Sequence, residues 1–169
     1  MYLFAYGSLM NPRSVAKTLS GERVTQRATL RGYRRKMNAP FDGYAYLNIV
    51  PDTASSVSGV LIPMTEAELE LFSSREEGYE KVDVTEMLSS RTEGEALAFI
   101  APDIECRFKV PRSYLMTCMS GVPETERAQW LAETIMNDIE EDADNPIYEF
   151  AAYDHFGVAG RSWEEIVKL

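Results

Sequence analysis

Apolar and polar positions near the N-terminus predict one buried strand followed by a short helix. Residues 2–6, Tyr-Leu-Phe-Ala-Tyr, are all apolar or aromatic, which is typical of a buried strand. Gly7 interrupts this run. Asn11 followed by Pro12 is the pattern of a helix cap and a first helical position, and the helix is expected to reach about Leu19.

The next part of the chain is predicted to be mainly β-structure. Residues 23–36 are rich in β-branched residues and arginines, with Gly32 in the middle, and predict either a strand pair or one long bent strand. Residues 43–50 predict a strand that Pro51 ends. Residues 56–63 predict another strand.

One helix and two more strands are predicted in the middle of the chain. Thr65 suits an N-cap and Glu68 the matching capping-box position, and apolar spacing supports a helix only to about Ser74. Residues 79–86 alternate between apolar and polar, as in a half-buried strand. Residues 94–101 predict one more strand.

The C-terminal part is predicted to be mostly helical. Residues 111–120 predict a short helix, and residues 123–142 give the strongest helical pattern. The apolar stripe of that second helix consists of Trp130, Leu131, Ile135 and Ile139. Residues 147–156 predict an extended aromatic segment, and Ser162 is expected to cap a last short helix.

These elements together predict an α+β protein built as a single domain. About six strands with few regular crossover helices disfavour a doubly wound parallel sheet. We expect a small mixed β-barrel or curled sheet flanked by helices, spanning residues 1–169, with a C-terminal extension of uncertain role over residues 146–169. The chain length of 169 residues fits one domain with its own core.

Composition excludes several classes of function. The net charge of −10 disfavours binding to nucleic acid or to an anionic membrane surface. One histidine, His155, and two cysteines, Cys106 and Cys118, leave almost no material for a metal centre. A basic leader and a long apolar run are both missing from the N-terminus, so we expect a cytoplasmic protein with reduced thiols. Carboxylates remain as the main acid–base groups.

Three short segments are candidates for chemistry, although each is weak by itself. Tyr6-Gly7-Ser8-Leu9 leaves a strand where backbone N–H groups can approach a ligand, although an ordinary turn has the same pattern. In Arg75-Glu76-Glu77-Gly78-Tyr79, only one of the two glutamates is expected to face the core, where burial would raise its pKa toward that of a general base. Tyr114, at a predicted helix start, is typical of core packing with its hydroxyl at the rim.

The order of these segments resembles the γ-glutamylcyclotransferase-like family. The similarity covers the Tyr6-Gly7-Ser8-Leu9 opening, the Ser58-Gly59-Val60-Leu61 strand, the Arg75-Glu76 pair before Tyr79, and the Pro111-x-x-Tyr114 segment. It extends over roughly residues 2–140 in the right order. The fold implied by this resemblance is a small mixed β-barrel with helices.

The resemblance also implies roles for particular residues. Glu76 matches the general acid–base, with Glu77 as the alternative one position later. The backbone of Tyr6, Gly7, Ser8 and Leu9 matches the loop that holds the glutamyl group, and Tyr79 and Tyr114 match pocket tyrosines. The expected partner is a small γ-glutamyl substrate, with no metal and no cofactor. The choice of substrate and the oligomeric state stay open, and a non-catalytic member that binds a ligand or a protein is the alternative.

Overall fold

The computed structural model describes residues 1–21 and 23–140 of the chain, and these form seven strands, four α-helices and three short 3-10 helices. The strands are β1 (Tyr2–Ala5), β2 (Gln26–Phe41), β3 (Tyr44–Pro63), β4 (Glu80–Asp83), β5 (Ala96–Ile100), β6 (Val110–Pro111) and β7 (Ile139–Glu140). The α-helices are α1 (Pro12–Ala16), α2 (Glu66–Arg75), α3 (Arg112–Ser120) and α4 (Arg127–Ala132). The 3-10 helices are η1 (Ser8–Met10), η2 (Thr85–Met87) and η3 (Glu124–Glu126).

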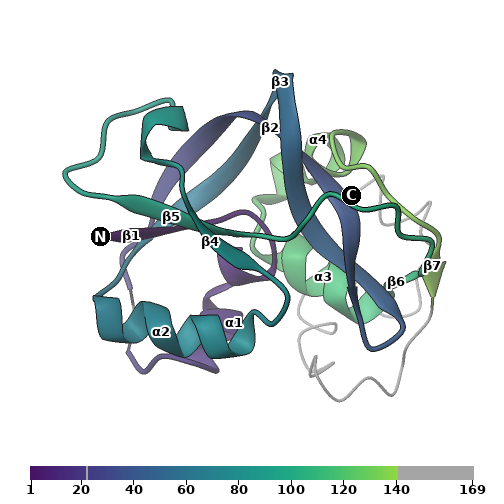
Figure 1. Ribbon diagram of the computed structural model, residues 1–169, viewed down its shortest axis with the longest axis horizontal. Helices are drawn as coiled ribbons and strands as arrows, with labels where there is room; N and C mark the ends of the chain where they lie inside the picture. The colour runs from purple at the N-terminus through teal and green to yellow at the C-terminus, as the bar shows by residue number, and fades with distance from the viewer. Residues whose placement is uncertain (22, 141–169) are drawn as a thin grey trace.

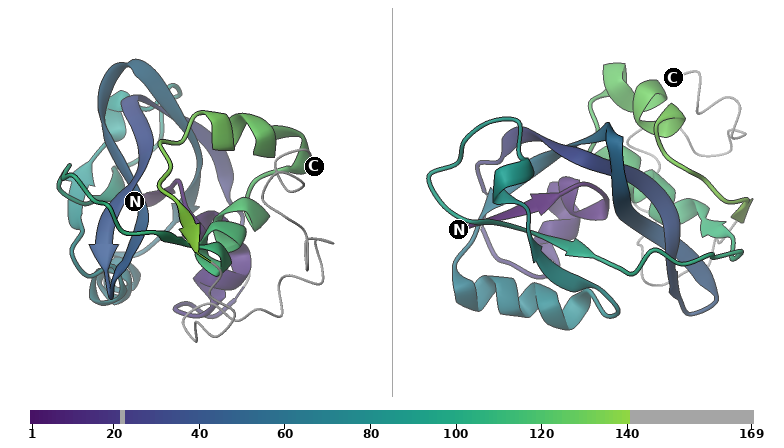
Figure 2. Two further views of the ribbon diagram at one scale, coloured as in Figure 1. Left: turned by 90° about the vertical axis from the view of Figure 1, so that its right-hand side faces the viewer. Right: turned by 45° about the horizontal axis from the view of Figure 1, so that its top comes forward.

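Five strands form a curled sheet in the order β2-β3-β1-β5-β4 (Figures 1 and 2). Within this sheet β1 and β5 pair in parallel, and the other neighbours pair antiparallel. The outer strand β2 meets the segment that follows β4 and η2 at an isolated bridge between Leu30 and Leu88. The fold is therefore the expected α+β type, a small mixed barrel flanked by helices, whose ring is joined at one bridge rather than along a full strand pair.

The predicted break at Pro51 is wrong, because β2 and β3 form one long hairpin. Pro51 pairs with Tyr33, directly beside a shift in register that begins at Arg31. Gly32 occupies this irregularity with a φ of 78°, a conformation that favours glycine. A proline lacks the N–H of a regular ladder, so its position next to a bulge explains why the strand continues through it.

The long predicted helix over residues 123–142 is also wrong, because α4 ends at Ala132. The N–H of Ile135 donates to the carbonyl of Arg35 at 2.9 Å, and the N–H of Met37 donates to the carbonyl of Ile135 at 2.8 Å. Backbone pairing with β2 therefore overrides the helical spacing of the apolar residues. Ile139, expected on the same helix, lies in β7.

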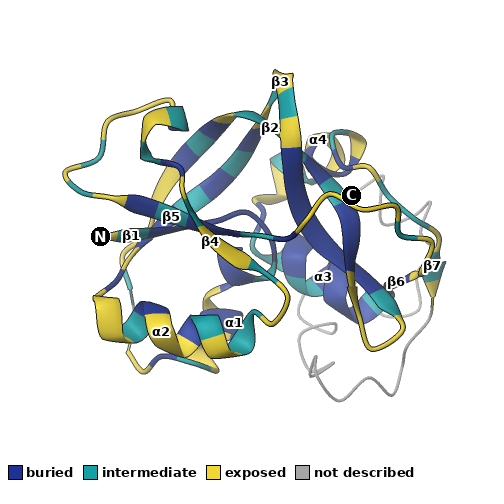
Figure 3. Cartoon of the chain, viewed as in Figure 1, coloured by how far each residue is buried: buried dark blue, intermediate teal, exposed yellow. Residues whose placement is uncertain are grey.

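The helices pack around the barrel in two groups (Figure 1). Helices α1 and α2 lie together on one side, and α3 lies with β6 and β7 on the other. Figure 3 shows exposed residues along α2, whereas most of α3 is buried. Gly121 ends α3 against η1, where an added Cβ would lie 2.5 Å from the carbonyl carbon of Met10. The end of α3 is thus held close to the chain that follows β1.

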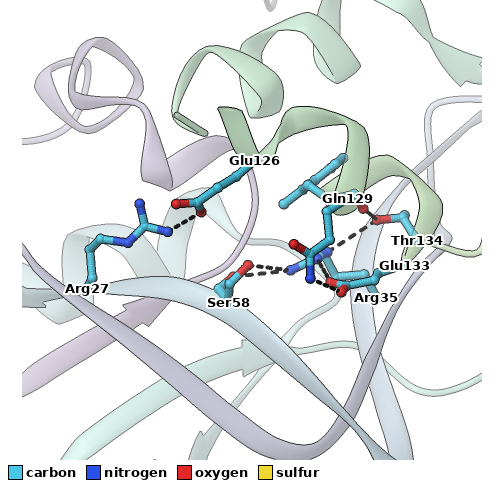
Figure 4. Close-up of polar contacts among 8 residues, drawn as sticks. Arg27, Arg35, Ser58, Glu126, Gln129, Glu133 and Thr134 are labelled. Carbon is cyan, nitrogen blue, oxygen red and sulfur yellow. Dashed lines mark hydrogen bonds and ion pairs between the residues drawn. The ribbon is translucent and has the colours of Figure 1, made fainter. Parts of the chain in front are cut away.

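Arg35 is a buried cation that ties α4 to the barrel (Figure 4). Its side chain is 1% exposed, and its Nη2 donates to a carboxylate oxygen of Glu133 at 3.1 Å. Its Nε donates to Thr134 Oγ1 and its Nη1 to the carbonyl oxygen of Ser58. The guanidinium also lies 5.0 Å from the ring centre of Trp130. Burial lowers the pKa of Arg35 to about 10, so the group stays charged near neutral pH.

We expect Glu133→Ala to lower the free energy of unfolding by about 1.5–3 kcal/mol, because a buried cation loses a charged hydrogen-bond partner. The carboxylate is 42% exposed, so solvent screening favours the lower end of this range. Urea unfolding measures the change. The matched control is Glu126→Ala, which breaks the exposed ion pair with Arg27 and should change stability by less than about 1 kcal/mol. Equal losses in the two variants would contradict the structural role assigned to Arg35.

Several sequence predictions fall outside the described residues. These are the end of the predicted helix beyond residue 140, the aromatic segment 147–156, the helix after Ser162, the extension 146–169 and His155. Within the described residues, no helix is long and apolar enough to cross a membrane.

Candidate active site

The turn after β1 brings backbone atoms close to two side chains of the core. Strand β1 lies between β3 and β5 at the centre of the sheet and ends at Ala5. A Cβ added at Gly7 would lie 3.0 Å from Leu47 Cδ2 and 3.5 Å from the hydroxyl oxygen of Tyr114. The absence of a side chain at Gly7 therefore lets the peptide groups of this turn approach β3 and α3 closely.

Helix α2 places Glu76 at its C-terminal end. The predicted capping box is confirmed at its start, since Thr65 accepts from the N–H of Glu68 and the Glu68 carboxylate accepts from the N–H of Thr65. At the other end, the N–H of Glu76 donates to the carbonyl of Phe72 at 2.9 Å. The N–H of Tyr79 then donates to the carbonyl of Glu76 at 3.2 Å, so a tight turn joins the helix to β4.

Arg75 anchors this end of α2 to α1. Its Nη1 donates to the carbonyl of Ser14 at 2.7 Å and to Thr18 Oγ1 at 3.1 Å, and its Nη2 donates to Ser14 Oγ at 2.8 Å. Its Nε lies 3.5 Å from a carboxylate oxygen of Glu76. The guanidinium is thus fixed by α1 and only touches the carboxylate at the edge of ion-pair distance.

The two adjacent glutamates lie in different surroundings. The side chain of Glu76 is 19% exposed, whereas Glu77 is an exposed residue. Burial raises the pKa of Glu76, and the positive charge of Arg75 opposes that shift without cancelling it. Burial penalises the ionised carboxylate, which makes Glu76 a stronger base than a solvated glutamate. The expectation that one of the two faces inward is thus met by Glu76.

Three tyrosines line the same small cavity as Glu76, from the ends of β1 and β4 and from α3. The hydroxyl of Tyr79 donates to the carbonyl of Leu47 at 2.8 Å, and the N–H of Leu47 donates to the hydroxyl oxygen of Tyr114 at 3.2 Å. The hydroxyl of Tyr6 donates to the carbonyl of Phe99. Burial raises the pKa of Tyr6 and of Tyr79 well above the ordinary value, so both hydroxyls stay protonated near neutral pH.

The predicted general base and the six predicted substrate-binding residues line one small cavity of about 40 Å³, whereas the alternative base Glu77 lines only the larger cavity described next. These seven are Tyr6, Gly7, Ser8, Leu9, Glu76, Tyr79 and Tyr114. A second cavity of about 580 Å³ shares four of its lining residues with the first, namely Ser8, Glu76, Tyr79 and Tyr114. The larger space is within the usual size range of a small-molecule site. Glu76 therefore lines both the small cavity and the ligand-sized one. Its role in catalysis stays a prediction.

Other lining residues of the larger cavity were not foreseen from the sequence. Phe41 and Tyr46 reach it from the two strands of the β2–β3 hairpin, and Arg13 and Lys17 reach it from α1 and its C-cap. The dipeptide Asp42-Gly43, a typical hairpin turn, was the signal that would have placed these two aromatic residues on adjacent strands, where Phe41 pairs with Tyr44 and Tyr46 with Ala39. Cys118 is fully buried, and burial raises the pKa of its thiol to about 12. The described residues contain no group of three or more His, Cys, Asp or Glu side chains placed to hold a metal ion.

The sequence of the chain matches the model of a known family. The sequence profile described as "Gamma-glutamyl cyclotransferase, AIG2-like" matches residues 3–117, which is more than half of the chain. The chain therefore belongs to the AIG2-like γ-glutamyl cyclotransferase family. A comparison with curated protein sequences gives no match.

Solved structures support the same fold. YkqA from Bacillus subtilis superposes with a TM-score of 0.63 at 22% identity, and the match covers 81% of this chain but only 55% of that protein. A human protein described as uncharacterized protein loc79017 gives a TM-score of 0.64 at 15% identity, covering 88% of this chain and 98% of that one. A protein described as gamma-glutamyl cyclotransferase gives 0.63 at 14% identity, with coverages of 86% and 96%. At these identities the likeness establishes the fold alone.

Proposed function

We propose that this protein is a γ-glutamylcyclotransferase that converts a small γ-glutamyl compound into 5-oxoproline and a free amine. The observation that carries the proposal is the position of Glu76. Its carboxylate is largely buried, its pKa is raised, and it lines the same small cavity as the Gly7–Ser8 turn. Membership of the γ-glutamyl cyclotransferase family supports the same reaction class.

The substrate of such a reaction brings its own nucleophile. The uncharged α-amino nitrogen attacks the γ-carbonyl carbon and forms the C–N bond of a five-membered ring, while the Glu76 carboxylate accepts a proton from that nitrogen. The oxygen of the tetrahedral intermediate is held by peptide N–H groups of the turn after β1. The bond to the leaving nitrogen then breaks, and Glu76 returns its proton to that nitrogen. One carboxylate thus makes both proton transfers, and the reaction balances without any other group.

The neighbouring residues have positioning roles in this scheme. Arg75, fixed by Ser14 and Thr18, holds the end of α2 so that Glu76 points into the cavity. Tyr79 binds the carbonyl of Leu47 and Tyr114 binds its N–H, so the two tyrosines fix the backbone of this residue. A cavity kept in shape in this way favours the ring-closing conformer of the substrate, which removes part of the entropic barrier.

The direct test is turnover of a substrate panel by the purified full-length chain. The panel contains glutathione, γ-glutamyl dipeptides, γ-glutamyl-ε-lysine and γ-glutamylated metabolites, and 5-oxoproline is measured by mass spectrometry. We expect release of 5-oxoproline from at least one member. If none is converted at enzyme concentrations equal to those of the substrate, the proposal is wrong. Binding of a panel member without turnover would then favour a ligand-binding member of the fold.

A further inference from the structure

The larger cavity is lined by two chemically distinct groups of residues besides the carboxylates of Glu76 and Glu77. One group is basic and includes Arg13 and Lys17, which lie four positions apart on and just after α1 and therefore project from the same face. The other group consists of apolar residues from two separate segments. These are Ala39, Pro40 and Phe41 at the end of β2, and Ala101, Pro102 and Ile104 after β5. A ligand in this space thus meets hydrocarbon, two carboxylates and the cationic side chains of Arg13 and Lys17.

A row of aromatic rings connects the exposed apolar residues of the larger cavity to Tyr114, which lines the small cavity with Glu76. The rings of Phe41 and Tyr46 meet edge to face with centres 6.2 Å apart, and those of Tyr46 and Tyr114 meet edge to face at 4.8 Å. All three rings line the larger cavity, and Tyr114 also lines the smaller one. A substrate whose amide lies at Glu76 therefore extends past these rings toward the opening of the larger cavity.

The apolar surface is unusual because part of it is left open to solvent. Phe41 is 45% exposed and Ile104 is 43% exposed, and both line the cavity. The backbone that carries the apolar residues after β5 is nevertheless held in place by hydrogen bonds. The side chain of Asn38 donates to the carbonyl of Ile104 at 3.1 Å, and Asn48 exchanges two hydrogen bonds of 2.9 Å with the backbone of Ala101. An apolar group bound here would bury hydrophobic surface without the cost of ordering a loop.

We propose that the amine released by this enzyme carries both an apolar side chain and a carboxylate, as a hydrophobic amino acid or peptide does. The inference rests on the proposed cyclotransferase reaction and specifies its leaving group. Phe41 and Ile104 receive the apolar side chain, and Arg13, which lines the same cavity, attracts the carboxylate. These three are specificity-determining residues, since they contact the leaving portion rather than the atoms that react.

Matched substrates test the preference in the unaltered protein. γ-Glutamyl-phenylalanine should have a kcat/KM at least about 10-fold above that of γ-glutamyl-glycine, because even a small apolar group in a pocket gives discrimination of this size. γ-Glutamyl-phenethylamide keeps the ring but lacks the carboxylate. Its kcat/KM should be roughly two- to fivefold below that of γ-glutamyl-phenylalanine, as for an exposed ion pair.

Variants assign the preference to its residues. In the double variant Phe41→Ser with Ile104→Ser, the ratio of kcat/KM for the phenylalanine and glycine substrates should fall toward one. In Arg13→Gln, the difference between γ-glutamyl-phenylalanine and the phenethylamide should disappear. Leu71→Ser is the matched control, because Leu71 is 54% exposed on α2 and lies outside the cavity lining, so both ratios should stay unchanged.

The outcomes separate this inference from the function on which it rests. Absence of 5-oxoproline from every panel member overturns the cyclotransferase reaction and the inference with it. Turnover with equal kcat/KM for γ-glutamyl-glycine and γ-glutamyl-phenylalanine overturns the inference alone. A preference that persists in the double variant likewise shows that the surface of Phe41 and Ile104 does not select the substrate.

Discussion

The variant Glu76→Gln should release 5-oxoproline about 10²–10⁴-fold more slowly than the wild type, the range for loss of a positioned general acid–base. Glutamine has nearly the same shape as glutamate, so the cavity that it shares with the Gly7–Ser8 turn is preserved. Its amide, however, cannot accept the proton of the attacking amine or return it to the leaving nitrogen. The rate of 5-oxoproline formation under single-turnover conditions measures the chemical step directly.

The same substitution should leave stability unchanged or raise it. Burial raises the pKa of Glu76 above the ordinary value, with Arg75 acting in the opposite direction. Between the unfolded-state pKa and the raised folded-state pKa, the folded protein binds more protons, so stability falls as pH rises through that window. Glutamine is neutral at every pH. Thermal unfolding followed from about pH 4 to about pH 8 should therefore show a smaller decline in Tm for the variant than for the wild type.

The neighbouring glutamate provides the control for both measurements. Glu77→Gln removes the same charge one residue later, from an exposed side chain that lines the larger cavity but not the small one, and should retain the rate of the chemical step. Full activity in Glu76→Gln would refute the catalytic assignment. Loss of activity in Glu77→Gln alone would move the general base to that residue. A large drop in Tm for Glu76→Gln would instead show that the carboxylate has a structural role.

The variant Gly59→Ala should lower the free energy of unfolding by about 3 kcal/mol, the upper end of the usual cost of overpacking. Gly59 lies next to Val60, the partner of Ala5 where β3 pairs with β1, and an added Cβ would lie 2.4 Å from the carbonyl oxygen of Ala5 and 2.7 Å from the ring of Phe4. The backbone oxygen cannot turn away as a flexible side chain would. For a domain of this size we expect Tm to fall by roughly 6–12 °C, measured by calorimetry.

A substitution at a second glycine is the control, because it shows the effect of a glycine-to-alanine change without a close contact. At Gly94, the nearest atoms would lie 3.9 Å from an added Cβ, which is ordinary van der Waals distance. Gly94→Ala should therefore leave Tm almost unchanged. Similar shifts in the two variants would rule out the close contact of Gly59 with β1 as the cause.

The parts of the fold that follow from local chemistry could be predicted from the sequence. The capping box of Thr65 and Glu68 starts α2 where expected, because both partners lie within one helical turn. Pro51 and Ile135 were misinterpreted because their environments are made by distant segments. Pro51 lies opposite a bulge, and Ile135 bonds to the backbone of β2. Neither partner can be recognised from residues nearby in the sequence.

The residues of the candidate site also fall into a predicted group and a group that could not be predicted. The residues of the small cavity were identified because short motifs carry them. The helix end predicted that only one of two glutamates faces inward, and the family resemblance selected Glu76 over Glu77. The exposed apolar residues of the larger cavity were not predicted, because Phe41 and Ile104 come from segments that meet only in three dimensions. Isolated hydrophobic residues on a surface are common, and only their convergence on one cavity distinguishes these two.

The central place of β1 has a consequence for the order of events in folding. Its Tyr2 pairs with Pro63 on one side and with Ala96 on the other, whereas β2 and β3 meet across a two-residue turn. Hairpin closure is fast and pairing between distant strands is slow, since long loops must close first. The β2–β3 hairpin can therefore form early, while the segment that ends in Gly7 is inserted only after β5 is available. Turnover should thus be one of the last properties to appear during refolding.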